Sequence, residues 1–207
     1  GGNPLAKSAD AQNISKWLTA TKLTEEKATI ETRGNWTLLT RAKLPGADSW
    51  SHQYGNAANT SSNNDKRVKD GMSVLWYGDP GPEKMVNRHA GAVGPISING
   101  RLFVQGDQSI MAYDAYNGRF LWEVQNPGAM RTGLKRSYEP GNMAGSDNSL
   151  FMVNGQRCVQ LDGATGKTIR LFEIPNATPD NKRAWGYISY ENGILFGSST
   201  DRAQLAA

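Results

Sequence analysis

Short apolar runs alternate with polar turns along residues 99–124, which read NGRLFVQGDQSIMAYDAYNGRFLWEV. The three apolar runs contain β-branched or aromatic side chains and span residues 102–104, 110–113 and 120–122. Runs of this length between glycine- and asparagine-containing turns are typical of strands, and Asn-Gly tolerates the positive φ that a type I′ turn needs. The pattern therefore predicts three antiparallel strands, with a type I′ turn at Asn117-Gly118.

The same frame recurs along the chain. Four positions recur 48 residues later, with no gap needed. The pairs are Leu102 and Leu150 (150−102), Asp114 and Asp162 (162−114), Gly118 and Gly166 (166−118), and Arg119 and Lys167 (167−119). A third copy begins at Asn192-Gly193, and Leu75-Trp76 matches Leu121-Trp122 from 46 residues earlier. Repeats of this length that hold several short strands are typical of β-propeller blades. Chance similarity is the alternative, and the gap-free match argues against it.

The repeat resembles that of a known family. AYDAYNGRFLW at residues 112–122 and QLDGATGKTIR at residues 160–170 resemble the pyrroloquinoline-quinone (PQQ) type propeller repeat, A-x-D-x-x-T-G followed by K/R-x-x-W. Residues 45–64 and the run VLWYGDPGP resemble the segment that leads into PQQ-like propellers of bacterial genomes. The resemblance covers residues 44–199 and implies an all-β fold, a β-propeller of PQQ-like blades. The family includes quinoprotein dehydrogenases and an outer-membrane assembly scaffold without quinone, so fold alone does not give function.

Residues 1–45 lie outside the repeat and are predicted to form a small α+β segment. Ile14, Trp17 and Leu18 are spaced for one helical face, and residues 28–32 and 36–40 predict a β-hairpin. A helix followed by a hairpin resembles the tail of a class I methyltransferase-like domain. The alternative is an extension that packs on the propeller. The chain holds no glycine-rich cofactor loop, so methyl transfer is not assigned.

Residues 46–207 are predicted to form a partial propeller of about two and a half blades, whereas a ring needs four or more. We therefore expect further blades beyond the sequence or association between chains, and we interpret the sequence as a fragment. An open set of blades leaves strand edges unpaired.

Composition narrows the classes of partner. The net charge is +4, and the largest basic cluster, Lys66, Arg67 and Lys69, is interrupted by acidic residues. This favours a solvated loop over a nucleic-acid interface. No apolar run is long enough for a membrane-spanning helix. The single cysteine, Cys158, falls in a predicted strand and is expected to be a buried structural thiol.

Candidate binding residues fall in the loops before each blade's innermost strand. Arg88, Arg136 and Arg183 recur at intervals of 48 and 47 (136−88 and 183−136), within loops at residues 86–91, 135–142 and 181–186. Arginines repeated once per blade predict a positively charged funnel that would bind a small anionic ligand, because guanidinium pairs well with carboxylates. PQQ is a tricarboxylate and fits this expectation. The alternative is that these arginines are solvent-exposed charges.

The resemblance suggests roles for four further loop residues. Glu139 and Asn142 offer oxygen ligands for Ca²⁺, Trp185 could stack on a planar ring, and His89 could act as a general base. The alternatives are a loop charge at Glu139, a turn residue at Asn142 and blade packing at Trp185. His52 is interpreted as structural. The quinoprotein alcohol dehydrogenases carry an adjacent Cys-Cys pair beside the quinone, and this sequence has no such pair.

Two functional classes remain open. The first is a ligand- or protein-binding scaffold, which the sequence favours. The second is part of a quinoprotein dehydrogenase that oxidises alcohols or sugars with bound PQQ and Ca²⁺. The resemblance implies a periplasmic or otherwise extracytoplasmic location.

Overall fold

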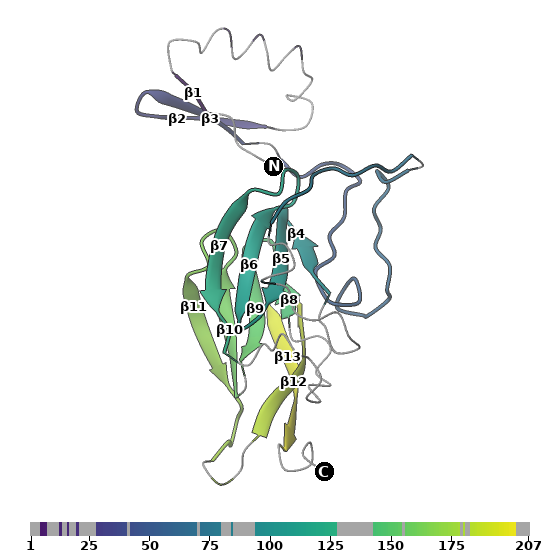
Figure 1. Ribbon diagram of the computed structural model, residues 1–207, viewed down its shortest axis with the longest axis vertical. Helices are drawn as coiled ribbons and strands as arrows, with labels where there is room; N and C mark the ends of the chain where they lie inside the picture. The colour runs from purple at the N-terminus through teal and green to yellow at the C-terminus, as the bar shows by residue number, and fades with distance from the viewer. Residues whose placement is uncertain are drawn as a thin grey trace. The chain divides into compact units, whose positions relative to one another are not determined.

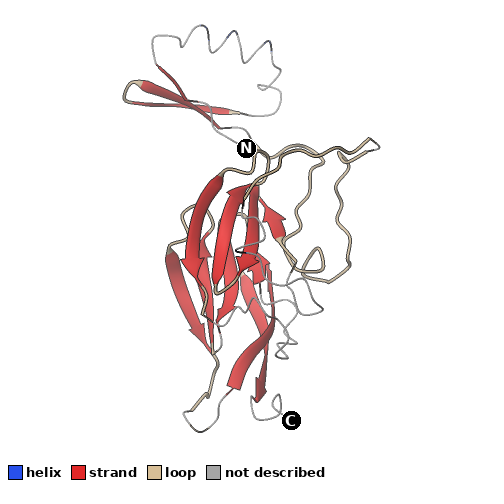
Figure 2. Ribbon diagram, in the orientation of Figure 1, coloured by secondary structure: helices blue, strands red, loops and turns tan. Residues whose placement is uncertain are grey.

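A computed structural model describes residues 5–7, 13, 16, 20, 28–40, 42–69, 71–79, 84, 94–127, 143–154, 156–178, 180 and 183–201. Every named element in this part of the chain is a β-strand (Figure 2). The chain forms two compact units, one of residues 1–48 and 64–73 and the other of residues 49–63 and 74–207. The predicted boundary at residue 45 lies close to the first of these breaks, and residues 64–73 go with the N-terminal unit.

The N-terminal unit contains a three-stranded antiparallel sheet in the order β1-β3-β2 (Figure 1). Its strands are β1 (Leu5–Lys7), β2 (Thr29–Arg33) and β3 (Trp36–Thr40). The predicted hairpin is confirmed, because Arg33 pairs with Trp36 across a turn in which Gly34 has a φ of 59°. The residues that predicted a helix, Ile14, Trp17 and Leu18, lie outside the described residues.

An exposed loop of the N-terminal unit holds the predicted basic cluster. Asp65 accepts backbone hydrogen bonds from Asp48 (3.0 Å), Arg67 (2.7 Å) and Val68 (2.9 Å). The Val68 backbone hydrogen bond, with those from Asp48 and Arg67, lowers the pKa of the Asp65 carboxyl. The side chains of Lys66, Arg67 and Lys69 are exposed. These residues therefore form the solvated loop that the interrupted charges predicted.

The larger unit contains two four-stranded antiparallel sheets and a two-stranded one (Figure 1). The first sheet consists of β4 (Ile96–Ile98), β5 (Arg101–Gly106), β6 (Ser109–Asp114) and β7 (Phe120–Gln125). The second consists of β8 (Met143–Gly145), β9 (Ser149–Asn154), β10 (Arg157–Asp162) and β11 (Thr168–Glu173). The third consists of β12 (Arg183–Glu191) and β13 (Ile194–Asp201). Each four-stranded sheet follows the chain order from inner to outer strand, which is the meander of a propeller blade.

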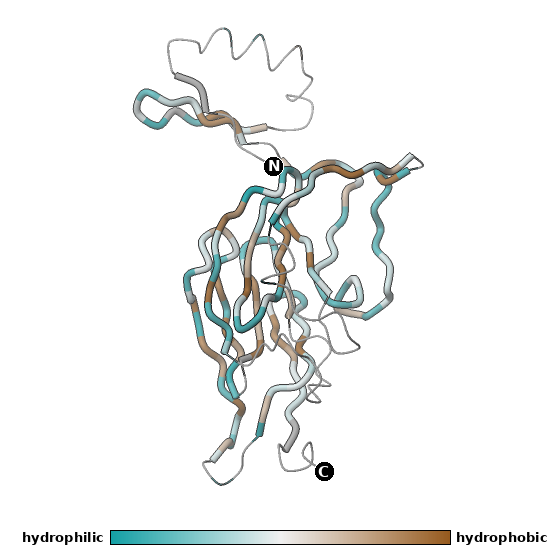
Figure 3. Tube along the Cα trace, viewed as in Figure 1, coloured by the Kyte–Doolittle hydropathy of each residue, from teal (hydrophilic) through white to brown (hydrophobic). Residues whose placement is uncertain are grey.

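Side chains on the two faces of β9 belong to two separate cores. Leu150 and Met152 of β9 pack toward the first sheet, in a cluster that includes Phe103 and Trp122. The intervening Phe151 packs on the other face, in a cluster with β12 residues. Successive strand side chains point to opposite faces, so a central strand buried on both must be apolar throughout. The run of apolar residues from Leu150 to Val153 in β9 follows from this arrangement, and Figure 3 colours the trace by hydropathy.

Two-residue hairpin turns form at Asn99-Gly100 and Asn192-Gly193. The φ angles are 49° and 72° at the first turn and 49° and 84° at the second. The flanking pairs are Ile98 with Arg101, and Glu191 with Ile194. Positive φ at both central residues is the type I′ requirement.

The prediction of a type I′ turn at Asn117-Gly118 is wrong in its turn type. These residues do reverse the chain between antiparallel strands, but only Gly118 has positive φ, at 73°. The connection spans residues 115–119. The Asp114 carboxylate accepts the backbone N–H of Tyr116 (2.9 Å) and of Asn117 (3.3 Å) and fixes this longer turn. An aspartate that bonds its own following backbone competes with the tighter turn.

Two tryptophans contact the turns before the outer strands of the two four-stranded sheets. Trp122 donates its indole N–H to Gly163 O at 3.1 Å and lies against Gly166, and Trp76 donates to Ala115 O at 3.0 Å and lies against Gly118. The two contacts are equivalent, since Ala115 and Gly163 are 48 residues apart. Trp76 therefore stands where an outer strand of a preceding blade would stand, and the predicted partial copy at Leu75-Trp76 is confirmed.

Candidate functional site

Most of the residues predicted to bind a cofactor lie outside the described part of the chain. The residues concerned are Arg88, His89, Arg136, Glu139 and Asn142. The funnel of arginines and the calcium ligands therefore stay predictions. Arg183 and Trp185 are described, and they share one strand.

That strand corrects the sequence prediction. Residues 181–186 were expected to form a loop, but Arg183 begins β12 and pairs with Asp201 of β13. Arg183 is exposed at the strand's first position, and Trp185 is buried two residues later on the same strand. The polar residues before it suggested a loop, whereas the alternation of apolar and small residues from Ala184 onward was the signal for a strand.

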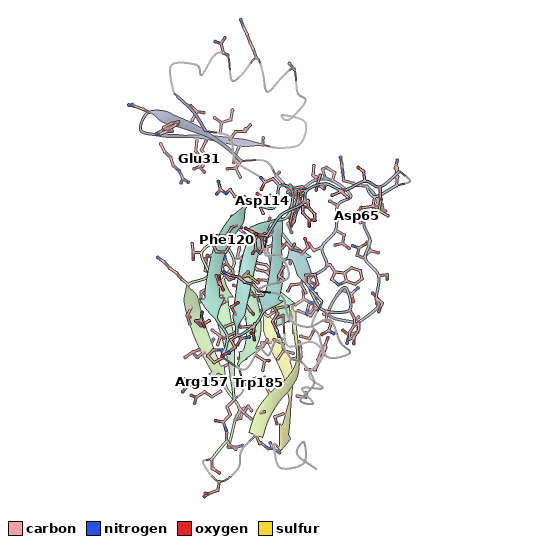
Figure 4. The ribbon with its side chains drawn as sticks, in the orientation of Figure 1. Glu31, Asp65, Asp114, Phe120, Arg157 and Trp185 are labelled. Carbon is pink, nitrogen blue, oxygen red and sulfur yellow. The ribbon has the colours of Figure 1, made fainter. Side chains whose placement is uncertain are left out.

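Trp185 packs in the core between the second and third sheets. It is 9% exposed and belongs to a cluster with Phe151, Cys158 and Ile188, and its ring lies against Gly197 of β13. Figure 4 labels Trp185 at the pair of strands β12 and β13. Its indole Nε1 is buried without a hydrogen-bond partner among the described groups. Buried polar atoms usually have a partner, so this atom is an unsatisfied donor among the described residues of the predicted site.

The described residues fit a stacked quinone poorly. Stacking needs an open ring face, and the Trp185 ring is enclosed by Gly197 and the core cluster. The described residues also contain no group of three His, Cys, Asp or Glu side chains that could hold a metal ion. Of the three predicted anion-binding arginines, Arg183 lies in the described part of the chain, and its side chain is exposed.

Cys158 is confirmed as a buried structural thiol. Its side chain is 0% exposed, within the cluster between the second and third sheets. Burial raises its pKa to about 12, so the thiolate that a nucleophile requires is scarcely formed near neutral pH.

The turns that close each blade carry aspartates of repeated geometry. Asp162 accepts the Thr165 hydroxyl (2.8 Å) and the backbone N–H of Ala164 (3.0 Å) and Thr165 (2.8 Å). The Thr165 hydroxyl contributes most to a lowered pKa of Asp162. Asp114 occupies the same place in the preceding blade. The carboxylates organise turns and are not free for acid–base chemistry, which agrees with the repeat pattern that singled them out.

Residues 49–63, here called the crossing segment, reach the innermost strand of all three sheets. Trp50 exchanges backbone hydrogen bonds of 2.8 Å with Ser97 of β4, and His52 forms a bridge with Ala144 of β8. On β12, the Tyr187 hydroxyl donates to Asn59 Oδ1 at 2.7 Å. A β-bulge between Trp185 and Ile188 accompanies this contact. No local sequence pattern predicts this arrangement, because its contacts join residues up to 128 positions apart.

Asn56 organises the polar loop within the crossing segment. Its Oδ1 accepts the backbone N–H of Ala58 at 3.0 Å and of Thr60 at 3.4 Å, and its Nδ2 donates to the Thr60 hydroxyl at 2.6 Å. Asn59 has a φ of 55°, a conformation that asparagine tolerates. The loop is thereby shaped to present Asn59 to β12.

Two comparisons with known proteins found no match. No protein-family model matches the chain. No curated protein matches it either, so the predicted likeness of residues 1–45 to a methyltransferase-like domain finds no support there. Among the described residues, no helix is long and apolar enough to cross a membrane.

Solved structures share the architecture at low identity. A quinohemoprotein alcohol dehydrogenase from Pseudomonas putida HK5 is 19% identical with a TM-score of 0.52, over 76% of this chain and 23% of that one. A europium-containing methanol dehydrogenase is 16% identical with a TM-score of 0.51, over 77% and 28%. A quinohemoprotein alcohol dehydrogenase from Comamonas testosteroni is 15% identical with a TM-score of 0.51, over 74% and 23%.

This chain spans about a quarter of the length of the solved chains it matches. The neighbours are β-propeller proteins, and the antiparallel meanders described here have the same blade form. The predicted all-β, propeller-type fold is therefore confirmed, and it is similar to that of the quinohemoprotein dehydrogenases.

Proposed function

We propose that this chain is part of a β-propeller scaffold that binds a protein partner along the open edge of β13. The observation that carries the proposal is a contrast between equivalent strands. Phe151 of β9 is 1% exposed, whereas Phe196, which lies 45 residues later (196−151) in the equivalent strand β13, is 53% exposed. Phe151 packs on its sheet face against β12 residues of the neighbouring sheet, whereas Phe196 belongs to no apolar cluster of the described residues, and among the described strands β13 pairs only with β12.

Exposed apolar side chains on one face of β13, beside an edge that no described strand pairs with, favour contact with another chain. Ile194 on the same strand is 56% exposed. The edge presents unpaired backbone groups that give affinity, while alternate side chains give specificity. We propose that a second copy of this chain is the partner that contacts this strand.

The test is sedimentation of the chain over a wide concentration range, with matched isoleucine variants. We expect reversible self-association that Ile194→Thr weakens by roughly tenfold, which corresponds to about 1.4 kcal/mol. Ile169→Thr is the control, because Ile169 is 55% exposed on β11 and outside the proposed edge. A chain that stays monomeric at every concentration, or equal effects of the two variants, would contradict the proposal.

The quinoprotein alternative has one observation in its favour, the unpartnered Trp185 indole N–H. A ligand carboxylate could accept it, with Arg183 on the same strand, but the enclosed ring counts against stacking. We therefore expect no saturable binding when PQQ and Ca²⁺ are titrated and quinone absorbance is followed. Saturable binding that weakens in Trp185→Phe and Arg183→Gln would favour the alternative. An extracytoplasmic location is proposed from the family resemblance, and cell fractionation tests it.

A further inference from the structure

The crossing segment is tied to the third sheet through one buried histidine. His52 is 1% exposed, and its Nε2 accepts the backbone N–H of Tyr190 at 3.1 Å and lies 3.4 Å from the Ser189 hydroxyl. Its Nδ1 lies 2.8 Å from the Ser51 hydroxyl. A backbone N–H can only donate, so Nε2 must be unprotonated. The neutral tautomer therefore carries its proton on Nδ1, which donates to Ser51.

The same few residues hold the segment against the second sheet. The N–H of Gly145 in β8 donates to Ser51 O at 2.8 Å, and His52 and Ala144 form a bridge. Ser51 and His52 thus lie between the inner strands β8 and β12. Loss of the Tyr190 hydrogen bond would disturb a point where two sheets and the segment meet.

We propose that His52 is an acid-sensitive latch that holds the crossing segment on β12 while its imidazole is neutral and releases it on protonation. A protonated imidazole donates from both nitrogens and accepts nothing. Its Nε2–H would then face the Tyr190 N–H, and a charge would be enclosed in a site that is almost closed to water. Both effects favour a state in which the segment has moved off the strand.

The groups around His52 do little to stabilise its charged form. The crossing segment has no acidic or basic residue, and its one other titratable side chain is Tyr54. Neither Met143–Gly145 of β8 nor Ile96–Ile98 of β4 contains a titratable side chain. The charged side chains on β12 are Arg183 and Glu191, and the charge of Glu191 acts on His52.

Burial lowers the pKa of His52 below its ordinary value of 6.5, and the charge of Glu191 acts in the opposite direction. The released segment regains the ordinary pKa, so the released state binds more protons. The latch is therefore at full strength above pH 6.5 and weakens as the pH falls from 6.5 toward the lower pKa of the bound imidazole. Between pH 7.5 and 5.0 the population of the released state is expected to rise by up to about 30-fold.

Hydrogen exchange followed by mass spectrometry tests the latch, with rates corrected for the intrinsic effect of pH. Peptides that cover residues 49–63 and 183–191 should exchange faster at pH 5.0, while a peptide from β6 should not change. His52→Gln keeps an acceptor for the Tyr190 N–H and cannot titrate, so its exchange should not depend on pH. Tyr187→Phe is the matched control: it removes the Asn59 hydrogen bond, so it should speed exchange at both pH values and keep the pH dependence.

Nitrogen NMR of the imidazoles gives a second measurement that does not depend on the variants. The chain has two histidines, and His89→Gln leaves His52 as the single signal. We expect the tautomer with the proton on Nδ1 and a pKa below 6.5. The opposite tautomer, or unchanged exchange of residues 49–63 at a pH where His52 is protonated, would overturn the proposal.

Discussion

At the scale of single residues, the indole N–H of Trp122 forms a hydrogen bond between two blades, although its ring lies in an apolar core. The side chain is 7% exposed in the core between the first two sheets, 5.7 Å from the Phe103 ring. Its N–H donates to Gly163 O across to the next blade. The bond sits in a buried site, so removing the donor leaves a carbonyl without its partner.

Trp122→Phe is therefore expected to lower the free energy of unfolding by about 1–3 kcal/mol, because a buried acceptor loses its partner. Urea unfolding followed by circular dichroism measures the change. Trp36→Phe is the control, since Trp36 is 46% exposed on β3, and exposed substitutions usually change stability by less than about 0.5 kcal/mol. Equal effects of the two variants would show that the inter-blade hydrogen bond contributes nothing.

At the scale of an element, two glycines in turns both have positive φ but differ in how closely other atoms approach them. Gly166 has a φ of 72° and Gly193 a φ of 84°. A Cβ on Gly166 would lie 2.8 Å from the Trp122 ring, whereas a Cβ on Gly193 would meet no atom within 4 Å. The comparison separates backbone strain from the close approach of the tryptophan.

Gly193→Ala is expected to cost about 1–2 kcal/mol from the left-handed conformation alone. Gly166→Ala is expected to cost about 1–3 kcal/mol more, because the Trp122 ring must shift in a packed core. Thermal and urea unfolding of both variants measure the difference. If Gly166→Ala costs no more than Gly193→Ala, the tryptophan does not rest on the turn as described.

Strands and blade repeats could be predicted from the sequence, because their signals are local. Strands β5 and β9 are indicated by the apolar runs around Leu102 and Leu150, and the offset of 48 residues between these runs indicates the repeat. The turn type at Asn117-Gly118 was missed because the Asp114 carboxylate, not the dipeptide, decides the backbone there. Strand β12 was missed at Arg183 because polar residues precede it.

The candidate site was less predictable, because its contacts are distant in sequence. His52 and Tyr190 are 138 residues apart, and no spacing rule connects them. The enclosed ring of Trp185 likewise depends on Gly197 of the neighbouring strand. Sequence could name these residues as polar or aromatic, whereas only packing decides whether a side chain binds a ligand or fills a core.

At the scale of the whole molecule, the described residues of the two units differ in how much apolar core they form. All three apolar clusters of the described residues belong to the larger unit. In the N-terminal unit the buried side chains of the described strands are Thr37 and Leu39. A unit of this size is marginally stable by itself.

We therefore expect unfolding in urea to occur in two steps, with the N-terminal unit first. Pulsed hydrogen exchange at increasing urea should show that peptides from residues 29–40 lose protection before peptides from residues 102–125. Trp122→Phe should lower the midpoint of the second step and leave the first unchanged, because Trp122 belongs to the larger unit alone. A single shared transition, shifted as a whole by Trp122→Phe, would mean that the two units fold as one cooperative body.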